Sequence, residues 1–437
     1  MTTTITRRRL LALGGACAAG LAAADPPADV TLRIGEITAD IGRGHSVKTL
    51  AYDGRIPGPV LRMAEGKTVV IDVINETRRP EMIHWHGFHI PPEVDGAHEE
   101  GTPMVQGLDR RRFSFTASPA GTRWYHTHAM AGHDLSIGTY SGQFGMVVVE
   151  PSANPARYDL EVPILLHEWS PYFASGVDMD VSYKFYSVNG KMLGAGEPVR
   201  VRAGQRAAFR IVNASATLRH QLALPGHAFT VTALDGNPVP HPRSVPVLDI
   251  APGERIDAIV EMSSPGVWVL GETDDAQRAA GAGIVIEYAG AKGPAQWSAP
   301  PEFTWDYAVF GENVAAPEPD ARIAIVIEPG QNGNLWALNG KSYPQTYPIR
   351  LRGGARNRLV FDNRGTMDHP VHLHRHSFEL VRLTGRPVSG IVKDVVLVPA
   401  RQTVEADVVA NNPGPSLFHC HQQFHMDFGF MAVMTYE

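Results

Sequence analysis

GKTVVIDVIN, residues 66–75, runs from a glycine to an asparagine with apolar side chains recurring between polar ones. That pattern is typical of a β-strand with one buried face. The same offset from Gly to Asn returns as GQRAAFRIVN at residues 204–213 and as GARNRLVFDN at residues 354–363. A turn precedes each copy, and a second short match follows each one, at residues 121–125, 266–270 and 414–418. The chain therefore contains three copies of an internal repeat.

The repeat predicts three consecutive all-β domains, which we place at residues 30–150, 157–290 and 300–437. Stretches rich in Pro, Gly and Ala separate them as linkers, at residues 150–158 and 289–301. Each unit has the length of an ordinary domain. Short strands bounded by turns predict a β-sandwich in each domain.

The first 24 residues have the features of an export leader. Arg7, Arg8 and Arg9 precede the apolar run 10–23, and Ala22 to Ala24 form a small-residue cleavage site. The paired arginines suit a twin-arginine signal, and an ordinary secretory leader is the alternative. We therefore expect a periplasmic or secreted protein. The apolar run is too short for a membrane span, and no later segment is a candidate for one.

The rest of the chain carries 36 basic and 45 acidic residues without a basic cluster. That balance argues against a nucleic acid or an anionic membrane as a partner. Exported proteins often contain disulfides, yet beyond the leader, which holds Cys17, Cys420 is the only cysteine. Because a free thiol is exposed to oxidation in such a compartment, we expect a chemical role for it rather than a packing role.

Domains 1 and 3 each carry two His-x-His pairs at corresponding places in the repeat, and domain 2 carries none. The pairs are His84 with His86, His126 with His128, His372 with His374, and His419 with His421. In domain 2 the matching positions hold Leu222, Leu224, Gly271 and Thr273. One such pair is more often an ordinary surface or core feature than a ligand set. Four pairs in register are hard to explain by chance.

In a strand, residues i and i+2 point to the same face, so each pair directs two imidazoles the same way. If domains 1 and 3 face each other, the eight imidazoles form one group, which we name the histidine cluster. A zinc site usually needs only four ligands. Imidazole-rich, open coordination suits copper instead.

The same alternation makes Cys420 point away from His419 and His421, toward a separate metal. Its partners should be histidines of domain 3 that no pair has used: His425 lies just after the strand, and His369 opens the segment HPVHLH. A cysteine with two histidines is the ligand set of a blue-copper electron-transfer site. We name these three residues the Cys420 site. The main chain on either side of Cys420 would then connect the two sites.

The segments HWHG, WYHTHA, HPVHLHRHSF and FHCHQQFH resemble, in order and spacing, the four copper signatures of the three-domain multicopper oxidases, the laccase-like group. The resemblance covers the whole chain after the leader. It implies three cupredoxin-like Greek-key β-sandwich domains and four copper ions. It also implies one-electron oxidation of a small donor coupled to reduction of dioxygen to water, in a chain that acts as a monomer.

The resemblance also assigns the ligands. His369, Cys420 and His425 would hold the type 1 copper, which accepts electrons from the substrate. His84 and His372 would hold the type 2 copper. The type 3 pair would be held by His86, His126, His128, His374, His419 and His421.

Two further residues are singled out by their place in the signatures. The family's axial position at the type 1 copper falls on Phe430, which cannot ligate, and Met431 would point away in a strand. We expect Phe430 to give a higher potential than methionine would, because the axial ligand tunes it. Asp95 falls where the family keeps an acid near the type 2 copper, so it is a candidate for a proton-transfer or orienting role. An exposed turn aspartate is the alternative.

Three functions compete at this stage. The first is a laccase-type oxidase of phenols or aromatic amines, with Cys420, His425 and Asp95 in catalysis. The second is a metallo-oxidase acting on Cu(I), Fe(II) or Mn(II), which would need an acidic or Met-lined approach to His425. The third is a copper-free cupredoxin-fold protein of the cell envelope, and the complete donor set argues against it.

Overall fold

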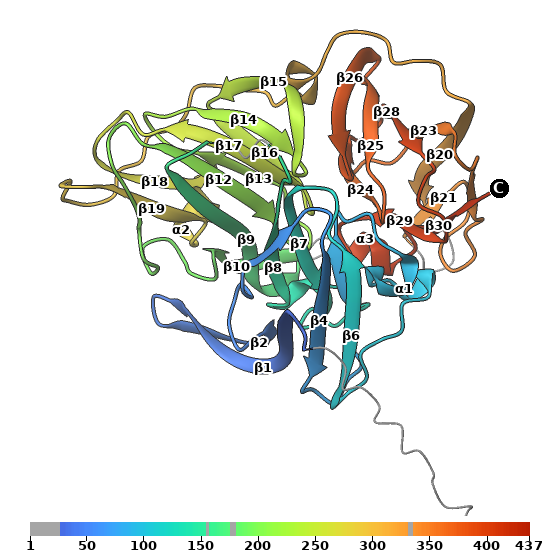
Figure 1. Ribbon diagram of the computed structural model, residues 1–437. Coiled ribbons are helices and arrows are strands. Elements are labelled where there is room, and N and C mark those ends of the chain that lie inside the picture. The colour runs from blue at the N-terminus through green and yellow to red at the C-terminus, as the bar shows by residue number, and fades with distance from the viewer. Residues whose placement is uncertain (1–26, 154–156, 175–180, 331–334) are drawn as a thin grey trace, which may run out of the picture.

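The computed structural model describes residues 27–153, 157–174, 181–330 and 335–437. The expected leader, residues 1–24, lies outside the described residues. The chain forms three cupredoxin-like β-sandwich domains, each built from two facing sheets (Figure 1). Among the described residues, none of the helices is long and apolar enough to span a membrane.

Domain 1 pairs a sheet of order β2-β1-β4-β6 with one of order β3-β8-β7-β5. Its elements are β1 (Val30–Gly42), β2 (His45–Tyr52), β3 (Leu61–Ala64), β4 (Thr68–Asn75), β5 (Ile83–His86), α1 (Pro92–Asp95), η1 (His98–Glu100), β6 (Asp109–Thr116), β7 (Gly121–Thr127), η2 (Gly138–Tyr140) and β8 (Phe144–Glu150).

Domain 2 has sheets of order β10-β9-β12-β17-β14-β15 and β11-β19-β18-β13-β16. Its elements are β9 (Leu160–Phe173), β10 (Val181–Val188), β11 (Val199–Val201), β12 (Arg206–Asn213), β13 (His220–Ala223), β14 (Phe229–Leu234), β15 (Asn237–Val245), β16 (Val247–Ile250), β17 (Arg255–Glu261), β18 (Val267–Glu272), α2 (Asp275–Ala279) and β19 (Gly283–Tyr288).

Domain 3 repeats that topology in the sheets β21-β20-β23-β28-β25-β26 and β22-β30-β29-β24-β27. Its elements are η3 (Tyr307–Phe310), β20 (Ala321–Pro329), β21 (Trp336–Leu338), β22 (Ile349–Leu351), β23 (Arg356–Asn363), β24 (His369–Leu373), β25 (Phe378–Leu383), β26 (Arg386–Lys393), β27 (Val395–Val398), β28 (Thr403–Val409), β29 (Ser416–Cys420), α3 (Gln423–Asp427) and β30 (Met431–Tyr436).

The Gly-to-Asn repeat forms the same central strand in each domain: β4, β12 and β23. Its asparagine is buried and closes the strand end in the same way each time. In β4, the Asn75 amide donates to the carbonyls of Arg79 and Val105 at 2.7 and 3.0 Å, and its Oδ1 accepts from the Thr77 N–H at 2.9 Å. Asn213 and Asn363 make the equivalent bonds. The three copies of the repeat thus share these hydrogen bonds between the asparagine side chain and the backbone, as well as an apolar face.

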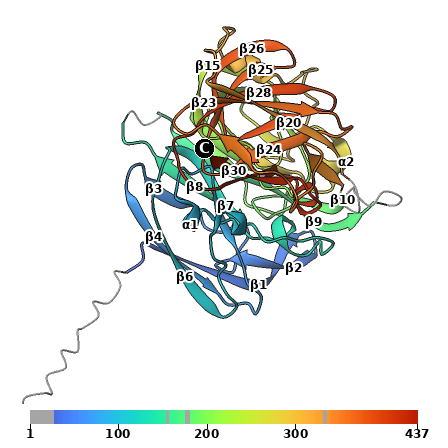
Figure 2. The same cartoon turned by 90° about the vertical axis from the view of Figure 1, so that its right-hand side faces the viewer.

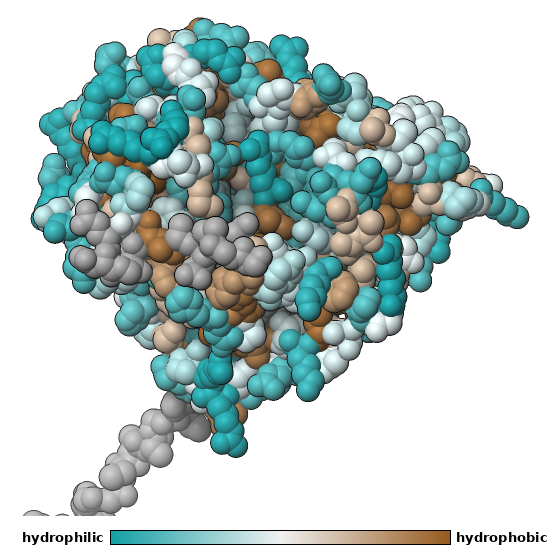
Figure 3. All heavy atoms as spheres, turned by 180° about the vertical axis from the view of Figure 1, so that it is seen from behind, coloured by the Kyte–Doolittle hydropathy of each residue, from teal (hydrophilic) through white to brown (hydrophobic). Residues whose placement is uncertain are grey.

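The three domains meet around a shared centre. Domain 1 lies below and domains 2 and 3 lie side by side above it in Figure 1, and the turned view shows the same contact between domains 1 and 3 (Figure 2). One apolar core runs continuously through domains 2 and 3, and a second fills domain 1. Hydrophilic residues predominate on the face shown in Figure 3, with smaller apolar patches between them.

Candidate metal centres

The strands that carry the His-x-His pairs lie next to each other within each domain. In domain 1, β5 pairs antiparallel with β7, which places His84 opposite His126. In domain 3, β24 pairs with β29, which places His372 opposite His419. Each domain therefore presents its four imidazoles from two paired strands and the residues that directly follow them, with His128, His374 and His421 just beyond the strand ends.

The eight imidazoles of the histidine cluster converge across the boundary between domains 1 and 3. Between domains, His84 Nε2 lies 3.4 Å from His372 Nε2, and His128 Nε2 lies 3.4 Å from His419 Nε2. Within domain 3, His374 Nε2 lies 3.0 Å from His419 Nε2. All eight side chains are buried. Domains 1 and 3 therefore face each other, as the predicted histidine cluster requires.

Cys420 points away from this cluster, into domain 3. Its Sγ lies 3.4 Å from His425 Nδ1 and 3.7 Å from His369 Nδ1, and the two Nδ1 atoms are 3.0 Å apart. All three side chains are buried. The Phe430 ring packs 4.9 Å from the His369 ring, whereas Met431 packs elsewhere, against Ala97, Leu417 and Met426.

Comparison with known proteins finds matches to one family in each of the three domains. Family models described as multicopper oxidase match residues 33–154, 171–291 and 317–437. The multicopper oxidase MmcO of Mycobacterium tuberculosis is 30% identical, over 91% of this chain and 84% of that protein.

The chain belongs to the multicopper oxidase family.

Two further similarities agree with that assignment. The bilirubin oxidase of Albifimbria verrucaria is 26% identical over 92% of this chain and 74% of its own length. The crystal structure of a multi-copper oxidase from Pseudomonas thermotolerans has the same fold, with a TM-score of 0.75 and 24% identity over 94% of this chain and 100% of that one.

The hydrogen bonds of this multicopper oxidase determine which nitrogens are free to bind a metal. The Nδ1 atoms of His84 and His372 donate to the backbone carbonyls of Asp95 and Asp394, at 2.9 and 2.7 Å. A carbonyl only accepts, so each Nδ1 carries the proton and each Nε2 presents a lone pair. Those two lone pairs face each other across 3.4 Å. Such a contact is unfavourable unless a cation lies between them.

The hydrogen bonds of His86 identify its free nitrogen in the same way, but its ring is turned the other way. Its Nε2 donates to Asp394 Oδ1 at 3.0 Å, so its Nδ1 presents the lone pair, 3.4 Å from His126 Nε2. The His126 Nδ1 in turn donates to the Thr127 carbonyl at 2.8 Å. Metal-binding histidines in proteins donate their other N–H to a carboxylate or carbonyl in this way.

Unpartnered atoms and protonation states fit the same interpretation. Neither nitrogen of His421 has a hydrogen-bond partner among the described residues, which is costly for a buried polar group. Burial lowers the pKa of His128, His369 and His372 to about 3. Their imidazoles are therefore neutral at neutral pH, as metal ligands must be. Donor atoms about 2.0 to 2.3 Å from one metal ion lie about 3 to 4 Å apart, as these do. The residues present therefore fit bound copper.

Asp95 accepts hydrogen bonds from both halves of the histidine cluster. Its backbone carbonyl accepts from His84 in domain 1, and its Oδ2 accepts from His374 Nδ1 in domain 3 at 2.7 Å. Glu100, which the sequence argument missed, lies beside it and accepts from the Leu417 N–H at 2.5 Å. Burial, together with repulsion from Asp95, raises the pKa of Glu100 well above its usual value. The neutral, protonated form of Glu100 is therefore favoured relative to that of an exposed glutamate.

Asp394 is a second residue that the sequence argument missed. Its carboxylate accepts from His86 and its carbonyl accepts from His372, so it contacts ligands from domains 1 and 3. Burial would raise the pKa of Asp394, but attraction to Arg255 lowers it to about 2. The one signal in the sequence is a charged pair inside an apolar run, Ile391-Val-Lys-Asp-Val-Val-Leu397.

Proposed function

We propose that this multicopper oxidase is a laccase-type enzyme that oxidises phenols or aromatic amines, one electron at a time, and reduces dioxygen to water. His369, Cys420 and His425 would hold the copper that accepts electrons, and the histidine cluster would hold the other three copper ions. Bound copper would supply the one-electron chemistry that organic side chains cannot. Four donor molecules lose one electron each for every dioxygen reduced.

The observation that carries the substrate assignment is a cluster of aromatic side chains next to His425 to which all three domains contribute. The Trp336 ring packs against the His425 ring, with 3.9 Å between the ring centroids and an interplanar angle of 34°. Phe173, at the end of β9, packs 5.6 Å from Phe424, and His133 of domain 1 packs 4.8 Å from Phe428. His133 and Phe173 are exposed. Aromatic faces of this kind favour a planar aromatic donor.

The acids next to the ligands of the Cys420 site are engaged rather than free to attract a metal cation. The Asp427 carboxylate accepts from the N–H groups of Ala131 and Gly132 at 3.0 and 2.7 Å, and burial raises its pKa to about 7. Asp368 accepts from the Ala400 N–H and pairs with Arg219 at 3.4 Å. An ionic donor such as Fe(II) would therefore find little negative charge at these two acids.

The chain's own groups supply the remaining requirements of the reaction. Cys420 is joined through the main chain to His419 and His421, so the two sites share a short bonded connection. Reduction of dioxygen consumes protons, and Glu100, whose pKa is raised by burial beside Asp95, would hold one next to the histidine cluster. We propose Asp95 and Glu100 as the acids that hold and pass protons there.

The test compares donors by the rate of oxygen consumption. With copper loaded, kcat/KM for a methoxyphenol should exceed the values for Cu(I), Fe(II) and Mn(II). The Phe173→Ala variant should lower kcat/KM for the phenol by roughly 2- to 12-fold, since an aromatic pair contributes about 0.5 to 1.5 kcal/mol. Phe303→Ala is the matched control, because Phe303 has the same exposed fraction of 36% but makes no ring contact among the described residues, whereas Phe173 packs on Phe424.

Other outcomes would identify the competing functions. Faster turnover of a metal ion than of any phenol would make the protein a metallo-oxidase. A well-folded protein that binds no copper would make it a non-catalytic cupredoxin-fold protein. We also propose that the chain is exported by its twin-arginine leader to the periplasm or beyond. We propose a monomer, because domains 1 and 3 complete the histidine cluster within one chain.

A further inference from the structure

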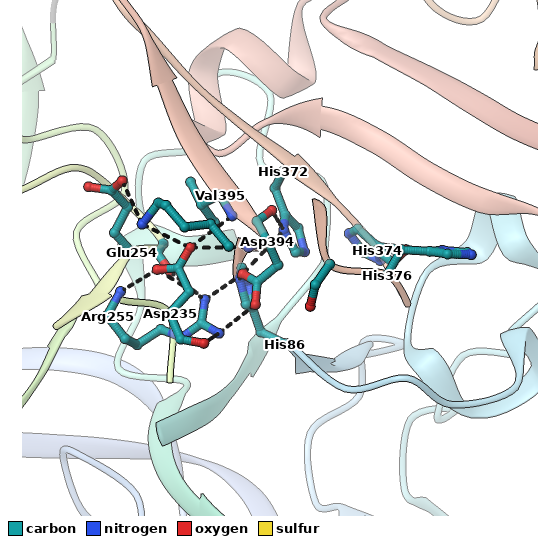
Figure 4. A network of polar contacts seen from close by, with 12 residues as sticks. His86, Asp235, Glu254, Arg255, His372, His374, His376, Asp394 and Val395 are labelled. Carbon is teal, nitrogen blue, oxygen red and sulfur yellow. Dashed lines mark hydrogen bonds and ion pairs between the residues drawn. The ribbon is translucent and has the colours of Figure 1, made fainter. Parts of the chain in front are cut away.

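Domain 2 contributes no donor to either candidate metal site, yet it reaches the histidine cluster through buried charges. Six charged side chains meet where the three domains join, and we name them the charge junction: Arg123, Asp235, Glu254, Arg255, Lys393 and Asp394. All are at most 1% exposed, and the positive and negative charges balance. Figure 4 shows how Asp235, Glu254, Arg255 and Asp394 converge beside His86 and His372.

Arg255, at the start of β17 in domain 2, holds the Asp394 carboxylate of domain 3 with both arms of its guanidinium. The two N–H groups donate to Oδ1 and Oδ2 at 2.5 and 2.6 Å. A fork of this kind defines the plane of the carboxylate as well as its position. The next cation, Arg123, is 3.8 Å from Asp394.

The orientation of Asp394 is passed on to two members of the histidine cluster. Its Oδ1 accepts from His86 Nε2 at 3.0 Å, which fixes the tautomer that turns Nδ1 toward the cluster. Its backbone carbonyl accepts from His372 Nδ1 at 2.7 Å, which turns Nε2 of that ring inward. One residue thus sets the direction of one ring in domain 1 and one in domain 3.

Other contacts from domain 2 hold the backbone of the same segment. The Asp235 carboxylate accepts from the N–H groups of Asp394 and Val395 at 3.2 and 3.0 Å and pairs with Lys393 at 3.1 Å. Residue 87, directly after His86, is a glycine with φ +86°, and a Cβ there would lie 2.5 Å from the Arg255 guanidinium. The absence of a side chain at residue 87 therefore leaves room for the Arg255–Asp394 pair next to His86 of the histidine cluster.

We propose that Arg255 is a positioning residue for the histidine cluster: through Asp394 it orients His86 and His372 before metal binds, so that the copper-free domain assembles the site formed by the other two. This inference rests on the proposed copper function. If Arg255 served only to hold the domains together, its loss would weaken the whole fold without selecting one metal site.

Arg255→Lys is the first test, because lysine keeps the charge but cannot donate through a planar fork. Copper-depleted protein is titrated with copper against a competing chelator. The blue absorption reports the Cys420 site, and electron paramagnetic resonance of type 2 copper reports the histidine cluster. We expect affinity at the histidine cluster to fall about 10- to 100-fold, as for other partners of metal ligands, with the Cys420 site unchanged. Equal affinity in both proteins, or equal loss at both sites, would overturn the proposal.

Arg358→Lys is the matched control. Arg358 makes a similar two-armed contact with Asp407, at 2.7 and 3.0 Å, and is also buried, but that pair lies between β23 and β28 and touches no candidate ligand. Its loss should leave copper affinity at both sites unchanged. If Arg255→Lys does not fold, the charge-balanced variant Arg255→Met with Asp394→Asn takes its place, with the same expected and opposing outcomes.

The unaltered protein provides a test that needs no variant. If Arg255 and Asp235 hold the segment before metal binds, the N–H groups of Asp394 and Val395 exchange with solvent equally slowly with and without copper. Exchange that becomes much faster on copper removal would show that the metal holds the segment, and the proposal would be wrong. If the unaltered protein binds no copper, the proposed function fails instead.

Discussion

His220 lies at the centre of a buried ion triad in domain 2, and replacing it should remove a stabilisation that declines as pH rises. Its Nε2 lies 2.6 Å from Glu168 and its Nδ1 lies 3.0 Å from Glu272. All three side chains are buried. In the repeat, Glu272 occupies the place that Cys420 occupies in domain 3, six residues after the matching glycine. Domain 2 thus holds a charge triad where domain 3 holds its thiol.

The magnitude follows from the pKa of His220. Burial alone would lower it, but attraction to Glu168 and the hydrogen bonds to both carboxylates raise it from 6.5 to about 10. A shift of that size corresponds to about 5 kcal/mol, and loss of one member of a buried ion pair costs about 3 to 5 kcal/mol. Because the folded pKa is the higher one, the stabilisation is complete below pH 6.5. It then declines by about 1.4 kcal/mol per pH unit up to about pH 10.

The assay is urea unfolding of the unaltered protein and His220→Gln, followed by circular dichroism at steps from pH 6 to pH 10. Gln cannot carry the positive charge, so the free energies of unfolding should differ by about 3 to 5 kcal/mol at pH 6 and converge toward pH 10. His241→Gln, at an exposed histidine of the same domain, is the control and should show no such difference. A difference that is small at pH 6, or constant over the whole range, would refute the reasoning.

Three further predictions concern the metal sites. Phe430→Met should lower the reduction potential at the Cys420 site, because a sulfur donor would replace a ring that packs 4.9 Å from His369. The free energy of unfolding should fall by less than about 1.5 kcal/mol. A redox titration giving an equal or higher potential would contradict this prediction. Cys420→Ser should lose one copper ion per chain and the blue absorption, and phenol oxidation should fall to background, while the histidine cluster keeps its copper. Persistence of the blue colour would show that the thiol is not the ligand. Copper removal should lower the free energy of unfolding by about 4 kcal/mol at copper concentrations 1,000 times the dissociation constant, measured by unfolding with and without a chelator.

Much of the site follows from properties of short stretches of chain. The alternation of a strand requires His419 and His421 to share one face and Cys420 to take the other. The repeat from Gly66 to Asn75 predicts its strand because its apolar face and its end-closing asparagine are both local. Spacing alone therefore predicts two kinds of site and the connection between them.

The contacts that complete the sites could not be read from spacing. Arg255 reaches Asp394 across 139 positions, and His86 reaches it across 308. The His86 ring presents Nδ1 rather than Nε2 to the histidine cluster only because its Nε2 donates to Asp394. The cluster of aromatic side chains next to His425 likewise includes Phe173 and His133 from other domains.

The sequence by itself determined the strand faces, the three-domain repeat and the donor types, because each depends on neighbours within a few residues. The tertiary structure alone decided which rings meet, which way each is turned and which carboxyl groups have a raised pKa. Those properties depend on how three domains pack, and on the low dielectric of the buried interface between them, where a charge must find its partner from another part of the chain.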